Sequence, residues 1–204
     1  MSDTRAGCVI AIVVTGMPGS GKSIFSETAR ELGFEVYVMG DVVRRELVRR
    51  GLPITRSNMA MVAVELRKIY GEDFVAKMTV NEVFSSHGVS GRCRYVVIDG
   101  SRSLKEIEIF RKSFSEVIII GIHASPKTRF ARLSSRGREG DPKSWEEFVA
   151  RDSLELSLGL GSVIAVADIM IVNDGIDINE FRRKAIEVLR SIARKDPSMA
   201  NDLQ

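Results

Sequence analysis

The sequence predicts a three-layer α/β fold in which helices cover both faces of a five-stranded parallel sheet. Short apolar, β-branched runs alternate with longer segments of helical spacing along the chain. Two of these runs, residues 8–14 and 117–122, are apolar throughout, as strands buried on both faces are. A glycine-rich loop follows the first run directly. Ligands of such sheets bind at the carboxyl ends of the strands.

The segments follow one another in a regular order. Residues 22–32 form the first helix, which Gly33 ends, and residues 35–39 form the second strand. Asp41 is expected to cap a helix over 42–50, and Ser57 a helix that reaches residue 70. A further helix over 73–86 precedes a strand at 94–99.

The second half continues the alternation. A helix over 103–113 leads into the buried strand at 117–122, and Ser125-Pro126 has the cap-and-proline pattern of the next helix start. A helix over 145–158, in which Trp145 and Phe148 are expected to pack, precedes the last strand at 168–172. The final helix has an apolar stripe, and residues 195–204 form a polar tail.

Composition bounds the class of protein. The 204 residues are 44% hydrophobic and 28% charged, which is typical of one globular domain. The net charge of +3 is too small to indicate nucleic-acid binding by itself. No run approaches the roughly 18 apolar residues of a membrane span. Cys8 and Cys93 form no C-x-x-C motif, so we expect reduced thiols and a cytoplasmic protein without membrane contact.

The glycine-rich loop fits G-x-x-x-x-G-K-[ST] at every fixed position. Small residues there let backbone N–H groups approach a phosphate, and the following helix directs its positive end at the anion. Lys22 is expected to reach the β- and γ-phosphates of ATP, and Ser23 to bind Mg²⁺. The predicted nucleotide-binding residues are Gly16, Met17, Pro18, Gly19, Ser20, Gly21, Lys22 and Ser23.

Charged residues follow two other predicted strands. Asp99 ends a strand and is expected to face the Mg²⁺ held by Ser23, or alternatively to cap the next helix. Arg102 lies three residues later, and Arg44 lies one helical turn after Asp41. Two guanidinium groups converging there suit an anionic acceptor, although Arg44 could equally lie on a solvated helix face.

Together these residues resemble the nucleoside monophosphate kinases, adenylate kinase above all. The motifs GMPGSGKS, Gly40-Asp41-Val42-Val43-Arg44 and Asp99-Gly100-Ser101-Arg102 occur in that family's order. The resemblance implies a P-loop NTPase fold in one domain, residues 1–204, with an acceptor-side helical insertion at 57–86. It also implies that Arg44 and Arg102 hold the acceptor phosphate. Arg136 and Arg138 would come from a short lid, residues 134–143, and Arg151 from the helix after it.

The chain departs from this family at several positions. Ser101 replaces a proline, and Glu106 replaces a base-reading glutamine. An acidic group such as Glu106 suits a guanine-like edge, but the pattern favours an exposed helix face. By resemblance, residues 173–175 would lie beside the donor base, whereas the local sequence favours a simple strand-to-helix turn.

A second resemblance concerns residues 38–47 and 167–175, which are similar to segments of dephospho-coenzyme A kinase. A hydroxyl acceptor benefits from a carboxylate base, for which Asp41 is the candidate. The chain also resembles an archaeal group of adenylate-kinase-related P-loop proteins.

The sequence therefore predicts an ATP- and Mg²⁺-dependent kinase that acts on a small-molecule nucleotide, with Lys22, Asp99, Arg102, Arg136, Arg138 and Arg151 as catalytic residues. Substrate contacts are expected from Asp41, Arg44 and Arg102, and metal contacts from Ser23 and Asp99. The alternatives are a hydroxyl-acceptor kinase and a nucleotide-binding regulator or ATPase without a small acceptor. Nucleic acid is a less favoured partner, for which a steep salt dependence of binding would be the evidence.

Overall fold

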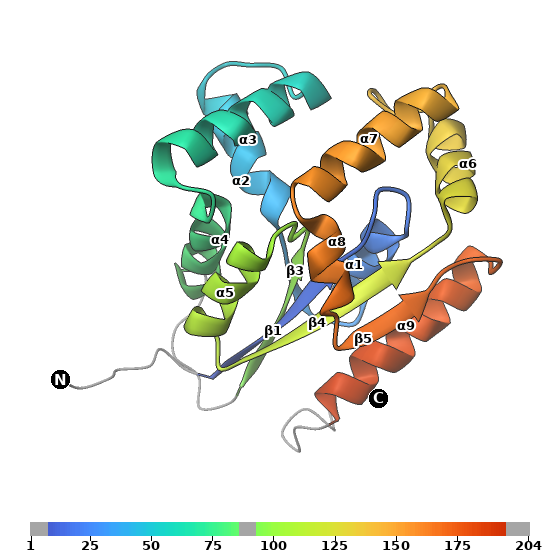
Figure 1. Ribbon diagram of the computed structural model, residues 1–204. Coiled ribbons are helices and arrows are strands. Elements are labelled where there is room, and N and C mark those ends of the chain that lie inside the picture. The colour runs from blue at the N-terminus through green and yellow to red at the C-terminus, as the bar shows by residue number, and fades with distance from the viewer. Residues whose placement is uncertain (1–7, 86–92, 195–204) are drawn as a thin grey trace.

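A computed structural model describes residues 8–85 and 93–194 (Figure 1). Within these ranges the strands are β1 (Val9–Thr15), β2 (Glu35–Val38), β3 (Arg94–Asp99), β4 (Glu116–His123) and β5 (Ile169–Val172). The helices are α1 (Lys22–Glu31), α2 (Met39–Arg49), α3 (Arg56–Tyr70), α4 (Phe74–Ser85), α5 (Leu104–Ser113), α6 (Pro126–Arg136), α7 (Trp145–Ser157), α8 (Leu160–Ala165) and α9 (Ile178–Ala193). Residue 86 of the predicted insertion and the predicted tail at 195–204 lie outside the described residues.

The five strands form one parallel sheet in the order β2-β3-β1-β4-β5. All seven residues of the central strand β1 are buried, which explains why its sequence shows no polar alternation. Val14 of β1 pairs with Asp99 of β3, so the loop after β1 begins beside that carboxylate. The predicted fold class, a parallel sheet covered on both faces, is confirmed.

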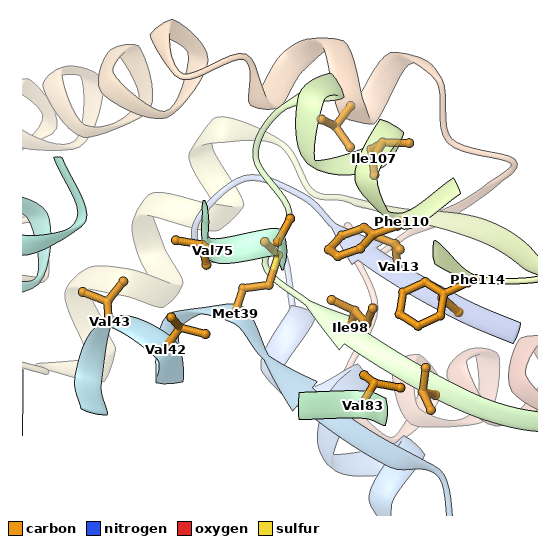
Figure 2. Packing of buried hydrophobic residues seen from close by; sticks show 14 of the residues in the cluster. Val13, Met39, Val42, Val43, Val75, Val83, Ile98, Ile107, Phe110 and Phe114 are labelled. Carbon is orange, nitrogen blue, oxygen red and sulfur yellow. The ribbon is translucent and has the colours of Figure 1, made fainter. Parts of the chain in front are cut away.

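Two apolar cores lie on opposite faces of the sheet. On one face, Ile12 of β1 belongs to the same cluster as Phe25 of α1 and Phe181 of α9. On the other face, Val13, Ile98 and Phe110 belong to the cluster that α2, α3, α4, α5 and α8 complete (Figure 2). These cores fix the strand ends, and therefore the loops that carry the polar side chains, in place.

Helices α6 and α7 form a separate unit that follows the carboxyl end of β4 (Figure 1). The Trp145 ring lies 5.4 Å from that of Phe130 and 5.0 Å from that of Phe148, measured between centroids. This aromatic cluster joins the two helices and confirms the prediction that Trp145 and Phe148 serve in packing. Helix α8, which the sequence did not predict, begins after Gly159 and includes Gly161.

The expectation of two reduced thiols is wrong, because Cys8 and Cys93 form a disulfide with their Cα atoms 4.4 Å apart. The next residues along each chain segment, Val9 and Arg94, are partners in the parallel pairing of β1 and β3. That register brings the two sulfur atoms together. A pairing across 85 residues leaves no mark in the local sequence.

Two predicted helix caps are also wrong. Helix α3 begins at Arg56 because the Thr55 side chain, and not that of Ser57, accepts a hydrogen bond from the Asn58 N–H. Helix α2 begins at Met39, which places Asp41 inside its first turn. Asp41 is therefore not a cap, and its carboxylate is available for other contacts.

In the part of the chain that the structure describes, none of the helices combines the length and the apolar character that a membrane crossing requires.

Candidate active site

The loop of residues 16–23, hereafter the phosphate loop, connects β1 to α1. Gly16 has a φ of +152°, and a Cβ added to it would lie 2.4 Å from the carbonyl oxygen of Ile122. Only glycine therefore allows this close passage of the loop past β4. Gly21 caps α1 without a side chain, so the first-turn N–H groups remain available to an anion.

Lys22 lies against the loop from which it comes. Its Nζ donates to the carbonyl oxygens of Gly16 and Met17, the latter at 3.3 Å. Burial lowers the pKa of Lys22, the negative charge of Asp99 raises it, and the positive charges of Arg102 and Arg151 lower it. The lysine thus shares its surroundings with three of the other predicted catalytic residues.

Segments distant in the sequence hold the phosphate loop. Asn173, which follows β5 and is buried, donates from Nδ2 to the Ser20 carbonyl oxygen at 2.8 Å. The interpretation of residues 173–175 as a simple turn is therefore incomplete. Ser20 Oγ is itself buried and makes no hydrogen bond with the described residues.

A buried ion pair supports the same loop from α6. The Arg129 guanidinium donates to both carboxylate oxygens of Asp152 in α7, at 2.6 and 2.8 Å, and to the Pro18 carbonyl oxygen at 3.3 Å. Arg129 is only 4% exposed. Sequence reasoning missed both partners, because nothing local relates a residue of one helix to a residue of the next.

Asp99 is buried at the carboxyl end of β3, and Ser26 Oγ donates to its Oδ2 at 2.8 Å. No hydrogen bond from the described residues reaches Oδ1. Because Mg²⁺ usually binds one or two carboxylates together with phosphate oxygens and waters, Asp99 and the exposed Ser23 hydroxyl form a donor set that fits this ion. The described residues include no group of three or more His, Cys, Asp or Glu side chains that could hold a metal.

Arg102 extends from the loop after β3 toward α7. Its Nε lies 3.5 Å from a carboxylate oxygen of Glu155, which the sequence had not indicated. Glu155 and Arg151 are one turn apart on α7, and their charges shift the pKa of Lys22 in opposite directions. The structure thus brings Arg102 and Arg151 near the phosphate loop, each with an acidic partner.

The prediction that Glu106 lies on an exposed helix face is wrong. Glu106 is 2% exposed, and its Oε2 accepts hydrogen bonds from the Arg102 N–H at 2.7 Å and the Ser101 hydroxyl at 3.2 Å. It also completes a capping box with Ser103. The apolar face of α5 packs on the sheet, which carries Glu106 inward. This carboxylate therefore fixes the backbone of Arg102 in position.

The lid arginines gather around Asp141. The Asp141 carboxylate accepts from Arg136 at 2.5 and 2.9 Å, from the Arg138 N–H at 3.0 Å and from Arg151 at 3.3 Å. The Arg136 hydrogen bonds lower the pKa of Asp141 to about 2, against the effect of burial. Arg136 and Arg151 are thus brought together, whereas Arg138 contributes its backbone to this contact.

Arg44 has an acidic partner on its own helix. Its guanidinium pairs with Asp41 on the same helix. The predicted convergence of Arg44 and Arg102 on an acceptor stays a prediction.

Comparison with known proteins gives the family. Residues 15–149 match the AAA domain family. A UPF0200 protein of Staphylothermus marinus is 48% identical over 94% of this chain and 97% of its own length. A UPF0200 protein of Methanopyrus kandleri is also 48% identical, over 91% of this chain and 92% of its own.

Solved structures share the fold at low identity. Shikimate kinase from Bacteroides thetaiotaomicron is 15% identical, with a TM-score of 0.54 over 88% of this chain and 98% of its own. TT1252 from Thermus thermophilus is 17% identical, with a TM-score of 0.58 over 92% of this chain and 98% of its own. The fold is thus that of a P-loop kinase. With relatives of nearly its full length, the chain belongs to the UPF0200 protein family and carries, at residues 15–149, a member of the AAA domain family.

Proposed function

We propose that this protein is a phosphotransferase that moves the γ-phosphoryl group of Mg-ATP to a small phosphorylated acceptor, with a nucleoside monophosphate as the leading acceptor class. The observation that carries the proposal is the pair of acid-partnered arginines beside the phosphate loop, Arg102 with Glu155 and Arg151 with Asp141. A nucleotide-binding regulator would have no use for an acceptor pocket, which a second group of cations beside the phosphate loop favours. An acceptor that is already ionised needs only such cations and the metal.

The donor nucleotide is assigned to the phosphate loop. Its backbone N–H groups would bind the phosphates, and Lys22 would turn from the loop carbonyls to the β- and γ-phosphates. Ser23 and Asp99 would hold Mg²⁺, whose chemistry is to neutralise charge between the β- and γ-phosphates. The Ser26 hydroxyl would orient the Asp99 carboxylate for this role.

The acceptor is assigned to the arginines beside the phosphate loop. Arg102 would bind its phosphate, with Glu155 and the buried Glu106 holding the arginine in place. Arg136 would stabilise the charge of the transferred group, Arg151 would reach in from α7 toward the acceptor phosphate, and the lid would exclude water that otherwise hydrolyses ATP. Helices α3 and α4 make up most of the proposed acceptor-side insertion.

A hydroxyl-acceptor kinase is the second candidate, because Asp41 is not used as a helix cap. Asp41 lines a pocket of about 370 Å³ at the edge of the sheet, together with Tyr37, Arg45 and Glu82. The named structural neighbours gluconokinase and shikimate kinase share only the fold with this chain. Pairing with Arg44 makes the Asp41 carboxylate a weaker candidate for a base.

The test is ADP release from Mg-ATP in the presence of AMP, CMP, UMP, GMP, dephospho-coenzyme A or no acceptor. We expect turnover with at least one nucleoside monophosphate and a loss of about 10²-fold or more in Arg102→Ala. Arg111→Ala, on the exposed face of α5, is the matched control and should keep its activity.

Two outcomes would contradict the leading proposal. Turnover with dephospho-coenzyme A alone, abolished in Asp41→Asn, would establish the hydroxyl-acceptor kinase. Equal ATP hydrolysis with every acceptor and with none would leave a nucleotide-binding regulator or ATPase.

A further inference from the structure

The first residue of α3, Arg56, reaches across to the lid. Its Nη1 donates to the carbonyl oxygen of Gly140 at 2.7 Å, a contact across 84 residues of sequence. Gly140 has a φ of +77°, and a Cβ added to it would lie 2.8 Å from Cδ of Arg56. The stem of the arginine therefore lies directly against a position that only glycine fills easily.

This contact places Arg56 beside the lid arginines. Gly140 directly precedes Asp141, whose carboxylate accepts from both Arg136 and Arg151. The charge of Arg56 is strong enough at Arg151 to help lower the pKa of that residue, after the larger effect of burial. Two guanidinium groups contact the Asp141 carboxylate and that of Arg56 acts on Arg151, for which Glu155 is the second nearby acid. Three arginines and Arg102, which pairs with Glu155, thus share two acids, which leaves an excess of positive charge.

The hydrogen bonds of this group are also incomplete. Arg151 Nε is buried and has no hydrogen-bond partner among the described residues. Arg56 contributes one of its five N–H donors to a neutral carbonyl oxygen, a bond that requires no positive charge. Placing a cation beside a partly desolvated arginine is unfavourable unless an anion offsets the repulsion.

We propose that Arg56 is an acceptor-binding residue, which together with Arg151 holds the phosphate monoester of the acceptor between α3 and the lid. This inference rests on the proposed phosphotransferase function and extends it to a residue that the sequence motifs did not indicate. A dianionic phosphate offers enough oxygen atoms for two guanidinium groups at once, and Arg56 is half-buried and already oriented toward the site. Binding there would connect the acceptor-side helix to the lid through the acceptor itself.

Steady-state kinetics of Arg56→Ala test the inference, with ATP as donor and the best nucleoside monophosphate of the acceptor panel. Loss of a charge-assisted contact should raise KM for the acceptor by about 10- to 100-fold, with KM for ATP within about twofold of the original value. Arg56→Lys keeps the charge but not the planar fork, and should give an intermediate KM. Lys68→Ala, an exposed change on the same helix, is the control.

A binding measurement separates this inference from the proposed function. Trp145, the protein's single tryptophan, begins α7 just after the lid, so its fluorescence can follow a titration with AMP or adenosine in the presence of ADP. We expect AMP to bind more tightly than adenosine, and Arg56→Ala to remove that difference. Gly140→Ala displaces the Arg56 stem but keeps its charge, and should also weaken the binding of AMP.

The outcomes are distinct. An active wild type whose KM for the acceptor is unchanged by Arg56→Ala would overturn the inference and leave the phosphotransferase proposal intact. An equal rise of both KM values would assign Arg56 to lid folding only. No turnover with any acceptor would contradict the proposed function, and equal binding of AMP and adenosine to the wild type would then overturn the inference as well.

Discussion

The phosphate loop and the arginine cluster, defined as Arg56, Arg102, Arg136 and Arg151, are built in opposite ways. The phosphate loop is one contiguous segment between a buried strand and a helix, and buried polar contacts from Asn173 and Arg129 support it. The arginine cluster comes from α3, the loop after β3, α6 and α7. Its members are partly exposed and, Arg56 excepted, paired with acids.

The difference shows which interactions fix the conformation of each half of the site. Backbone geometry sets the phosphate loop, so its glycines and Lys22 are sufficient to identify it from sequence. The arginine cluster depends on how four separate elements pack against one another. We therefore expect the loop side to be rigid and sensitive to buried changes, and the cluster to respond to charge and to ligands.

The largest effect on stability is expected at the buried pair below the phosphate loop. Arg129→Ala leaves the Asp152 carboxylate without its partner in a largely buried position, so the free energy of unfolding should fall by about 3–5 kcal/mol. Denaturant unfolding measures this loss. Arg45→Ala removes an exposed ion pair with Glu82 and should cost about 1 kcal/mol or less. Equal losses in the two variants would contradict the claim that buried polar contacts stabilise the phosphate loop.

The next effect concerns catalysis at the loop. Lys22→Ala should lower kcat by about 10²- to 10³-fold, because one cation is lost at the transferring phosphates. Its melting temperature should stay near the original, since the lysine contacts only loop carbonyls and its removal relieves a buried charge. Lys127→Ala, an exposed change on α6, is the control for both measurements. Full activity of Lys22→Ala would place phosphoryl transfer elsewhere.

A third effect lies at the end of the sheet away from both regions. Reduction of the Cys8–Cys93 disulfide should lower the free energy of unfolding by about 2–4 kcal/mol, because the intact disulfide closes a long loop in the unfolded chain. Calorimetry with and without reductant measures the shift, and the Cys8→Ser, Cys93→Ser double variant should be insensitive to reductant. A change in nucleotide binding on reduction would show that the sheet transmits the loss to the phosphate loop.

The smallest effect is a pH dependence in the lid. The folded-state pKa of Asp141, about 2, lies below its usual value, so its ion pairs stabilise the protein above about pH 4. That contribution should be lost as the pH falls from about 4 to about 2. Water screens the neighbouring arginines, so we expect only about 1 kcal/mol. The free energy of unfolding of Asp141→Asn should vary less with pH in this range than that of the original protein. The same pH dependence in both proteins would contradict the assignment.

What the sequence could predict follows the same division. Apolar runs and one contiguous motif are local features, and they were sufficient for the sheet, the loop and the position of Asp99 at a strand end. The acidic partners Asp141, Asp152 and Glu155 were missed because the packing of helices and loops in the folded chain selects them. Glu106 was assigned to the wrong face because packing, and not its own polarity, decides which side of α5 is buried.

The predictions of reduced cysteines and of two helix caps were wrong for related reasons. Strand register pairs Cys8 with Cys93, and register between strands separated by many residues is a tertiary property. Asp41 and Ser57 are good caps by residue type, but α2 begins at Met39, three residues before the expected start. Helix α3 is capped by Thr55, two residues before Ser57. Arg56 lies at such a shifted helix start, which is why no motif pointed to it.

The most direct test of the central claim follows the γ-phosphoryl group itself. Mg-ATP labelled at the γ-phosphate is incubated with protein and each nucleoside monophosphate, and the products are separated. We expect the label to appear in a nucleoside diphosphate, and Arg102→Ala and Arg56→Ala to lower this transfer. Label found only in inorganic phosphate, at one rate with or without acceptor, would contradict this expectation.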